Sequence, residues 1–478
     1  MATTRETAFH VMPGAAPDVM RDYDLATLGY QEMEFAFEGT AVSYEALGQG
    51  ERAADGRWDV KPGAPAPFRT RIVVRTPIDA LRFSGTVVVE WHNVSAGIDA
   101  APDWGFFHRS LTAAGHAWVG VSAQKVGIDG GGFVEGIHLK LLAPERYKDL
   151  EHPGDAWSYD IFTQAARLLE LPSDENPLGG LAPTQILAAG ESQSAACLVT
   201  YINAIDPHAQ LFDGFFVHGR PASGTSIDGV FIPASQRAGM EATRVAISSR
   251  GERIRDDVRV PVFVVQSETD VILLGGGLAA QPDSDRLRTW EMAGAAHADT
   301  YTVSAGRHDD GTLHADRMAE LLRPTTNLMI GQTDTPINAG PQQHYVTEAA
   351  LEHLVRWAAG GDAPPSAPPL ERNADHTGYE VDAHGIARGG LRTPWVDVPT
   401  AVMGGLGQTG ESFAMLFGRT EPFDDATLAA LYPGGEDEYL DRFTTSLDAA
   451  IAAGFILEAD RLEILAVAAS SFPLRLAD

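Results

Sequence analysis

Ser192, in the middle of residues 190–194, has the surroundings of an enzymatic nucleophile. The segment reads GESQS, follows the apolar run 185–189 and leads into the helical pattern 194–205. On a tight turn from a strand to a helix, a serine hydroxyl is held exposed, and small residues two positions before and after it let the chain turn. Glycine meets this requirement before Ser192, and serine meets it in part afterwards. Because the helix start adds N–H groups that suit an oxyanion, we predict that Ser192 is a nucleophile; a helix N-cap is the alternative.

Two later loops offer the base and the orienting acid that a serine nucleophile needs. In enzymes with such a turn, the acid and then the histidine follow the serine along the chain. Asp270 lies in the loop after the apolar run 260–266, and His297 lies in a small-residue loop after the next strand pattern. Functional side chains concentrate at such carboxyl ends of strands. We predict His297 as the base and Asp270 as the acid, with Glu268 as the alternative acid and Asp299 as a weaker candidate.

An oxyanion hole requires two N–H donors near the nucleophile. The first is normally the backbone N–H of the next residue, here Gln193, and the second comes from a loop after an earlier strand. That loop is residues 91–97, which lacks an HGGG motif; Asn93 and Val94 are the candidates. We also expect substrate contacts from three further residues: Trp91, His218 and Glu191.

Short apolar runs alternate with helical patterns and predict an α/β protein. Nearly continuous apolar runs, typical of buried parallel strands, occur at residues 85–91, 117–123, 185–189, 212–217 and 260–266. Helical patterns occur at residues 104–114, 156–171, 194–205 and 346–359. We therefore expect a mostly parallel central sheet with helices on both faces.

We expect three regions along the chain. Residues 1–68 form an N-terminal extension with antiparallel strands, because residues 32–45, like residues 69–75 after them, alternate in polarity. The core covers residues 69–362, with residues 218–259 as a cap insertion over the pocket. A proline-rich stretch, 363–370, then opens a C-terminal extension, 363–478, that packs on the core.

The composition excludes several classes of protein. The 478 residues include 35 Lys and Arg against 65 Asp and Glu, a formal net charge of −30. Because this excess repels phosphates, we expect no nucleic-acid partner and no anionic membrane surface. The single cysteine, Cys197, excludes an internal disulfide and a cysteine-based zinc site. Its apolar neighbours predict a buried, unreactive thiol.

We expect no cofactor and no metal ion. The glycine-rich segments GGGFVEG and GGGLAA lack the strand–turn–helix context of nucleotide-binding motifs. One stretch has metal-ligand residue types, although a polar loop explains it more simply: His308, Asp309, Asp310, His314 and Asp316. Residues 1–11 show no signal-peptide pattern and no apolar run reaches about 18 residues, so we expect a cytoplasmic protein. The oligomeric state is not predicted.

Several segments resemble the bacterial "alpha/beta hydrolase domain" esterase family. They are EWHNVSAG, WVGVSAQKVG, GESQSAACLVTYIN, QSETDV and WEMAGAAHAD, followed by GGLRTPWVDVP and LFGRTEPFD nearer the C-terminus. The resemblance extends from about Asp79 to the C-terminus. It implies an α/β-hydrolase fold, hydrolysis of carboxylic esters, and the usual roles for Ser192 and His297. It also implies that the C-terminal segment belongs to the fold. Many relatives carry an export signal, which this N-terminus lacks.

The sequence therefore predicts a serine hydrolase that cleaves a small-molecule ester through a Ser–His–Asp triad and an acyl-enzyme intermediate. The same triad would serve a lactonase, amidase, thioesterase or acyltransferase, because pocket access decides the acceptor. An alternative of another class is a non-catalytic binding protein on a hydrolase scaffold. The presence of all three triad residues in order disfavours that alternative.

Overall fold

The computed structural model describes residues 7–14, 21–48, 52–132, 134, 136–173, 175–228, 251–328, 331–411 and 413–477. One sheet has the strand order β1-β2-β3-β5-β4-β6-β7-β8-β9. Its strands are β1 (Ala8–Val11), β2 (Tyr30–Ala46), β3 (Val60–Pro77), β4 (Thr86–Trp91), β5 (Ala117–Val121), β6 (Gln185–Glu191), β7 (Gly214–His218), β8 (Val262–Ser267) and β9 (Leu287–Met292). All pairs from β5 to β9 are parallel, whereas β1, β2 and β3 join antiparallel. The predicted mostly parallel central sheet is confirmed.

Helices cover both faces of the sheet because its central strands are apolar on both sides. Helices α1 (Pro102–Ala113) and α12 (Gln342–Ala358) pack on one face, where Val88 and Phe263 contribute to the core. Helices α5 (Ser158–Arg167) and α6 (Gln193–Thr200) pack on the other face, around Val87 and Val89. Successive side chains of a strand point to opposite faces, so one short run supplies both cores. None of the helices in the described ranges is long and apolar enough to cross a membrane.

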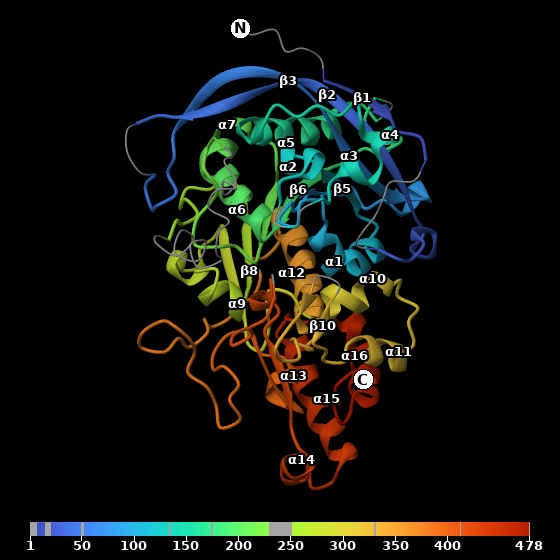
Figure 1. Ribbon diagram of the computed structural model, residues 1–478, viewed down its shortest axis with the longest axis vertical. Coiled ribbons are helices and arrows are strands. Elements are labelled where there is room, and N and C mark those ends of the chain that lie inside the picture. The colour runs from blue at the N-terminus through green and yellow to red at the C-terminus, as the bar shows by residue number, and fades with distance from the viewer. Residues whose placement is uncertain are drawn as a thin grey trace.

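The long strands β2 and β3 arch across one end of the molecule (Figure 1). The boundary expected between residues 68 and 69 falls inside β3, which continues without a break and pairs with β5 through Ile72 and Val121. The outer part of β3 contains Pro62, Pro65 and Pro67 and pairs with β2. Because proline is tolerated on an edge strand, this part forms a strand although its proline content argues against one.

The C-terminal segment packs at the opposite end, drawn in orange and red (Figure 1). It contains α13 (Pro394–Asp397), β12 (Ala401–Gly404), β13 (Arg419–Pro422), α14 (Asp425–Leu431), α15 (Glu436–Ala452) and α16 (Arg461–Ser470). Trp395 stacks on Tyr345 of α12 with ring centroids 5.6 Å apart, and Phe443 closes the same apolar cluster. Of the expected cap, 218–259, residues 229–250 lie outside the described part of the chain.

Candidate active site

Ser192 lies at the sharp turn between β6 and α6. Its backbone has φ 59° and ψ −115°, a region that residues other than glycine rarely occupy. Its N–H donates to His218 O at 2.9 Å, which fixes the turn against the end of β7. A Cβ at Gly190 would lie 3.1 Å from the backbone of Ser194, so glycine lets the turn close tightly. The Ser192 side chain remains partly exposed at the turn.

His297 contacts this serine, and Asp270 contacts His297. His297 Nε2 lies 2.9 Å from Ser192 Oγ, and His297 Nδ1 makes a short hydrogen bond to Asp270 Oδ1. The other oxygen of Asp270 accepts bonds from Ser267 N at 2.6 Å and Ser267 Oγ at 2.8 Å, in a capping box that starts α9 (Glu268–Ile272). Burial alone would raise the pKa of Asp270, but His297 and the Ser267 donors lower it. The carboxyl group is thereby kept ionised beside the imidazole.

Glu268 points away from the histidine, toward the C-terminal segment. Its two carboxylate oxygens accept the N–H groups of Gly294 at 2.7 Å and Gly405 at 2.8 Å. Burial raises the pKa of Glu268 to about 7. Of the two candidate acids, only Asp270 contacts His297 among the described residues. The geometry therefore favours Asp270 as the acid. Glu268 instead forms a structural tie, a pair of hydrogen bonds that joins the loop at Gly294 to the C-terminal segment at Gly405.

Replacement of Glu268 by glutamine is expected to destabilise the protein by about 1–3 kcal/mol, because a buried N–H donor loses its acceptor. The glutamine amide would turn its NH2 group toward Gly294 or Gly405, each of which presents an N–H. Urea unfolding of the variant measures this loss. The matched control is Glu145→Gln, where the side chain is 90% exposed and only a surface ion pair is lost. Equal unfolding midpoints for the two variants would contradict the proposed tie.

The C-terminal segment also supports the histidine loop. Thr269 Oγ1 accepts the N–H of His297 at 3.2 Å and donates to Gly405 O at 2.7 Å. Gln343 of α12 donates to His297 O at 3.3 Å. Sequence reasoning missed Thr269, Gln343 and Gly405, because their role depends on contacts between segments up to 136 residues apart. Only the position of Thr269 between the two candidate acids pointed to it.

Two backbone N–H groups are available for an oxyanion. Within the described residues, the N–H of Gln193 at the first position of α6 has no acceptor. The N–H of Val94 points at Gln193 Oε1 over a long 3.5 Å and is thus weakly engaged. By contrast, the N–H of Asn93 donates to Ala100 O at 2.9 Å. Gln193 and Val94 therefore fit the expected donors, whereas the Asn93 backbone does not.

The three residues expected to contact substrate have different surroundings. Trp91 is buried, packs on Phe162 and donates through Nε1 to Gln124 Oε1 at 3.1 Å, and the same oxygen accepts a bond from Gln193 Nε2 at 2.7 Å. His218 is also buried, with Nδ1 2.9 Å from Asp103 Oδ1. Glu191 lies in the site itself, because its Oε1 is 2.9 Å from His297 Nε2. Of these three residues, Glu191 contacts His297 directly, whereas the Trp91 and His218 rings bond Gln124 and Asp103.

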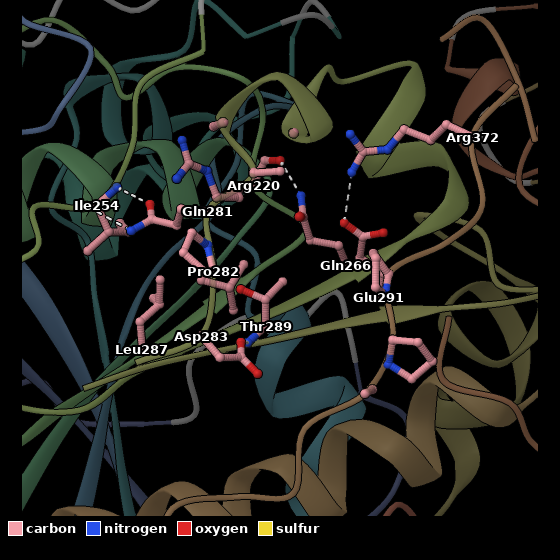
Figure 2. Close-up of a pocket in the computed structure, with 17 residues that line it drawn as sticks. Arg220, Ile254, Gln266, Gln281, Pro282, Asp283, Leu287, Thr289, Glu291 and Arg372 are labelled. Atoms are coloured by element: carbon pink, nitrogen blue, oxygen red, sulfur yellow. Dashed lines mark hydrogen bonds and ion pairs between the residues drawn. The ribbon is translucent and has the colours of Figure 1, made fainter. Parts of the chain in front are cut away.

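A cavity of about 440 Å³ is lined by residues that include Gln266, Gly276 and Glu291. Figure 2 shows Gln266 on β8 bonded to Arg220 O and Arg372 paired with Glu291 on β9. No triad residue lines this cavity. Gly276, which lines the cavity, packs closely on its neighbours, since a Cβ there would meet Gln266 Nε2 at 2.1 Å and Asp270 O at 3.1 Å. The cavity therefore does not hold the reacting bond.

Other reactive side chains lie away from the site. Cys197 is buried on α6, and burial raises the pKa of its thiol to about 12. Within the described ranges, no three His, Cys, Asp or Glu side chains are grouped to hold a metal ion. Of the residues with metal-ligand types, Asp309 bonds Tyr301 and Arg109, while His314 caps α11 (Ala315–Leu321). These contacts fit the interpretation as a polar loop.

Comparisons place this architecture among known proteins. The family model described as "Alpha/beta hydrolase domain" matches residues 3–466. A search of curated proteins finds no match. Similar solved structures include an a/b serine hydrolase without lid from Xanthomonas campestris, at 13% identity, covering 48% of this chain and 72% of that one, with a TM-score of 0.25. A Pyrococcus furiosus esterase is 9% identical, covering 57% and 86% respectively, with a TM-score of 0.30. A thermostable Pseudomonas putida esterase is 12% identical, covering 57% and 75%, with a TM-score of 0.26.

The family match reaches from the N-terminal strands into the last helix, α16, and includes the turn and both loops that meet at Ser192. Because it covers nearly the whole chain, the protein belongs to the alpha/beta hydrolase domain family.

Proposed function

We propose that this hydrolase cleaves carboxylic esters of small molecules, with Ser192 as the nucleophile. The observation that carries the proposal is the continuous set of contacts from Ser192 Oγ through both ring nitrogens of His297 to Asp270. A serine hydroxyl becomes nucleophilic when a base can accept its proton and an acid fixes the orientation of that base. The strained backbone of Ser192 supports the same proposal, because such strain clusters at active sites.

In the proposed reaction, Ser192 Oγ attacks the ester carbonyl while His297 Nε2 accepts the hydroxyl proton. The N–H groups of Gln193 and Val94 bind the oxyanion of the tetrahedral intermediate. His297 then donates the proton to the leaving alcohol, and an acyl-enzyme remains. In the second half, His297 activates water, which releases the acid and restores Ser192. Asp270 stabilises the imidazolium throughout.

The proposal is tested with a fluorophosphonate probe and a series of acyl esters of increasing chain length. We expect one covalent adduct, at Ser192 in a peptide map, and hydrolysis of at least part of the series. The profile across chain lengths identifies the acyl group that the site accepts. A wild-type protein that neither labels nor hydrolyses any ester would instead favour a binding protein on a hydrolase scaffold.

A further inference from the structure

We infer that Glu191 holds the His297 imidazole in its protonated form, so that turnover begins only when alkaline pH removes this proton. This inference rests on the proposed function, since it concerns the base of that reaction. It gives Glu191 a role that its position beside the nucleophile did not suggest. The role is a regulatory one, set by a second carboxylate on the histidine.

The contact between Glu191 and His297 requires a proton. Glu191 Oε1 lies 2.9 Å from His297 Nε2, the same nitrogen that lies 2.9 Å from Ser192 Oγ. A carboxylate oxygen and an unprotonated ring nitrogen both offer lone pairs, so they approach this closely only with a hydrogen between them. The opposite nitrogen, Nδ1, already donates to Asp270. With that hydrogen on the ring, the imidazole carries two N–H groups and faces a carboxylate on each side.

The Glu191 side chain is fixed in this position. It stands at the end of β6 and is 7% exposed. Its other oxygen, Oε2, accepts a bond from Asn93 Nδ2 at 3.2 Å, and the same NH2 group bonds Glu191 O at 3.0 Å. Asn93 is itself held, because its Oδ1 accepts the N–H of Ser95 at 2.8 Å. The carboxylate is therefore held against Nε2 as long as the loop after β4 keeps this conformation.

Other titratable groups also lie near the His297 ring. In the described part of the chain they include Asp270 on α9, His218 at the end of β7 and Asp299 in the loop after His297, and Asp103 on α1 lies beyond His218. Burial lowers the pKa of His218, and burial together with Glu191 raises the pKa of Asp103, so both tend to be neutral. Burial raises the pKa of Asp299 to about 6.

The balance at His297 follows from these groups. Burial alone would lower the pKa of His297, but Glu191 and then Asp270 outweigh it and raise that pKa well above its usual range. The two carboxylates that touch the ring thus decide its protonation state. A buried cation between two anions is also the arrangement in which each charge is compensated by direct contact.

The contact between Glu191 and His297 has opposite effects on activity at neutral and at alkaline pH. An imidazolium cannot accept the proton of Ser192, so the Nε2 proton must first leave to solvent, and the rate rises with pH until it does. Once Nε2 is free, the same Glu191 charge stabilises the imidazolium that forms when Ser192 attacks. Glu191 therefore lowers activity at neutral pH and supports it at alkaline pH.

The test is the rate of Ser192 labelling by a fluorophosphonate as a function of pH, in wild type and Glu191→Gln. The glutamine is isosteric and can still accept the Asn93 bond, but it lacks the charge. We expect the rise of the labelling rate with pH, its rising limb, to move to lower pH by roughly one to three units, because one close opposite charge is lost. The alkaline plateau should fall in the same variant. Glu191→Asp keeps a charge and should leave the limb above that of Glu191→Gln.

Two results would overturn the inference. One is a limb at the same pH in Glu191→Gln and wild type, which is what a purely structural role of Glu191 gives. The other is a rise that moves with Asp299→Asn and not with Glu191→Gln, since burial raises the pKa of Asp299 to about 6. Failure of wild type to label at any pH would refute the proposed function instead. In that event, ¹⁵N NMR of the His297 ring still decides the inference, because its titration should shift in Glu191→Gln without any turnover.

Discussion

Replacement of Ser192 by alanine is expected to remove fluorophosphonate labelling and to lower ester hydrolysis by about a millionfold, the loss typical of a serine nucleophile. The physical reason is that alanine has no hydroxyl with which to form the acyl-enzyme at this turn. The His297 ring and the N–H groups of Gln193 and Val94 remain, so a small residual rate from oxyanion binding is expected. Labelling followed by peptide mapping, together with single-turnover kinetics, measures the effect.

Two neighbours on α6 provide matched controls for this variant. Ser194 is buried, and its hydroxyl has no hydrogen-bond partner among the described residues, so Ser194→Ala should still label. Cys197 is buried with a raised pKa, so Cys197→Ala should label as well. If Ser192→Ala still labelled, or if either control lost its label while folded, the nucleophile would have to be sought elsewhere.

Replacement of Asp270 by asparagine is expected to lower kcat by about ten-thousandfold. We expect the free energy of unfolding to change little. Asparagine keeps the shape but presents either a neutral oxygen or an NH2 group to His297 Nδ1. The imidazole then loses the charge that stabilises its protonated form and the acceptor that sets its tautomer. The second oxygen position, bonded to Ser267, can still be filled, so the start of α9 should persist.

Glu268→Gln is the matched control for Asp270→Asn, because both change an acid in the same five-residue helix, α9. We expect it to retain most of kcat while unfolding at lower urea concentration. The reverse pattern, a large loss of kcat in Glu268→Gln and a small one in Asp270→Asn, would transfer the acid to Glu268. Comparing rates at a temperature where both variants are folded keeps stability out of the comparison.

The local features of the site could be predicted from the sequence. A glycine two residues before Ser192, an apolar strand before it and a helix after it are all encoded within residues 185–205. The order of serine, acid and histidine is also a property of the chain itself. Strand and helix patterns have periods of a few residues, so the α/β architecture follows from them as well. In the same way, the apolar neighbours of Cys197 were enough to predict its burial.

The tertiary structure decided what depends on distant segments. Asp270 and Glu268 are two residues apart and chemically alike, and they differ only because one meets His297 and the other meets Gly294 and Gly405. The contact of Glu191 with His297 joins positions 106 residues apart by packing β6 against the loop after β9. Such contacts form only when the sheet is assembled, because short-range periodicity carries no information on which loops meet. The sequence by itself thus determined the turn that carries Ser192 and the kind of fold, and the folded chain determined what each carboxylate contacts.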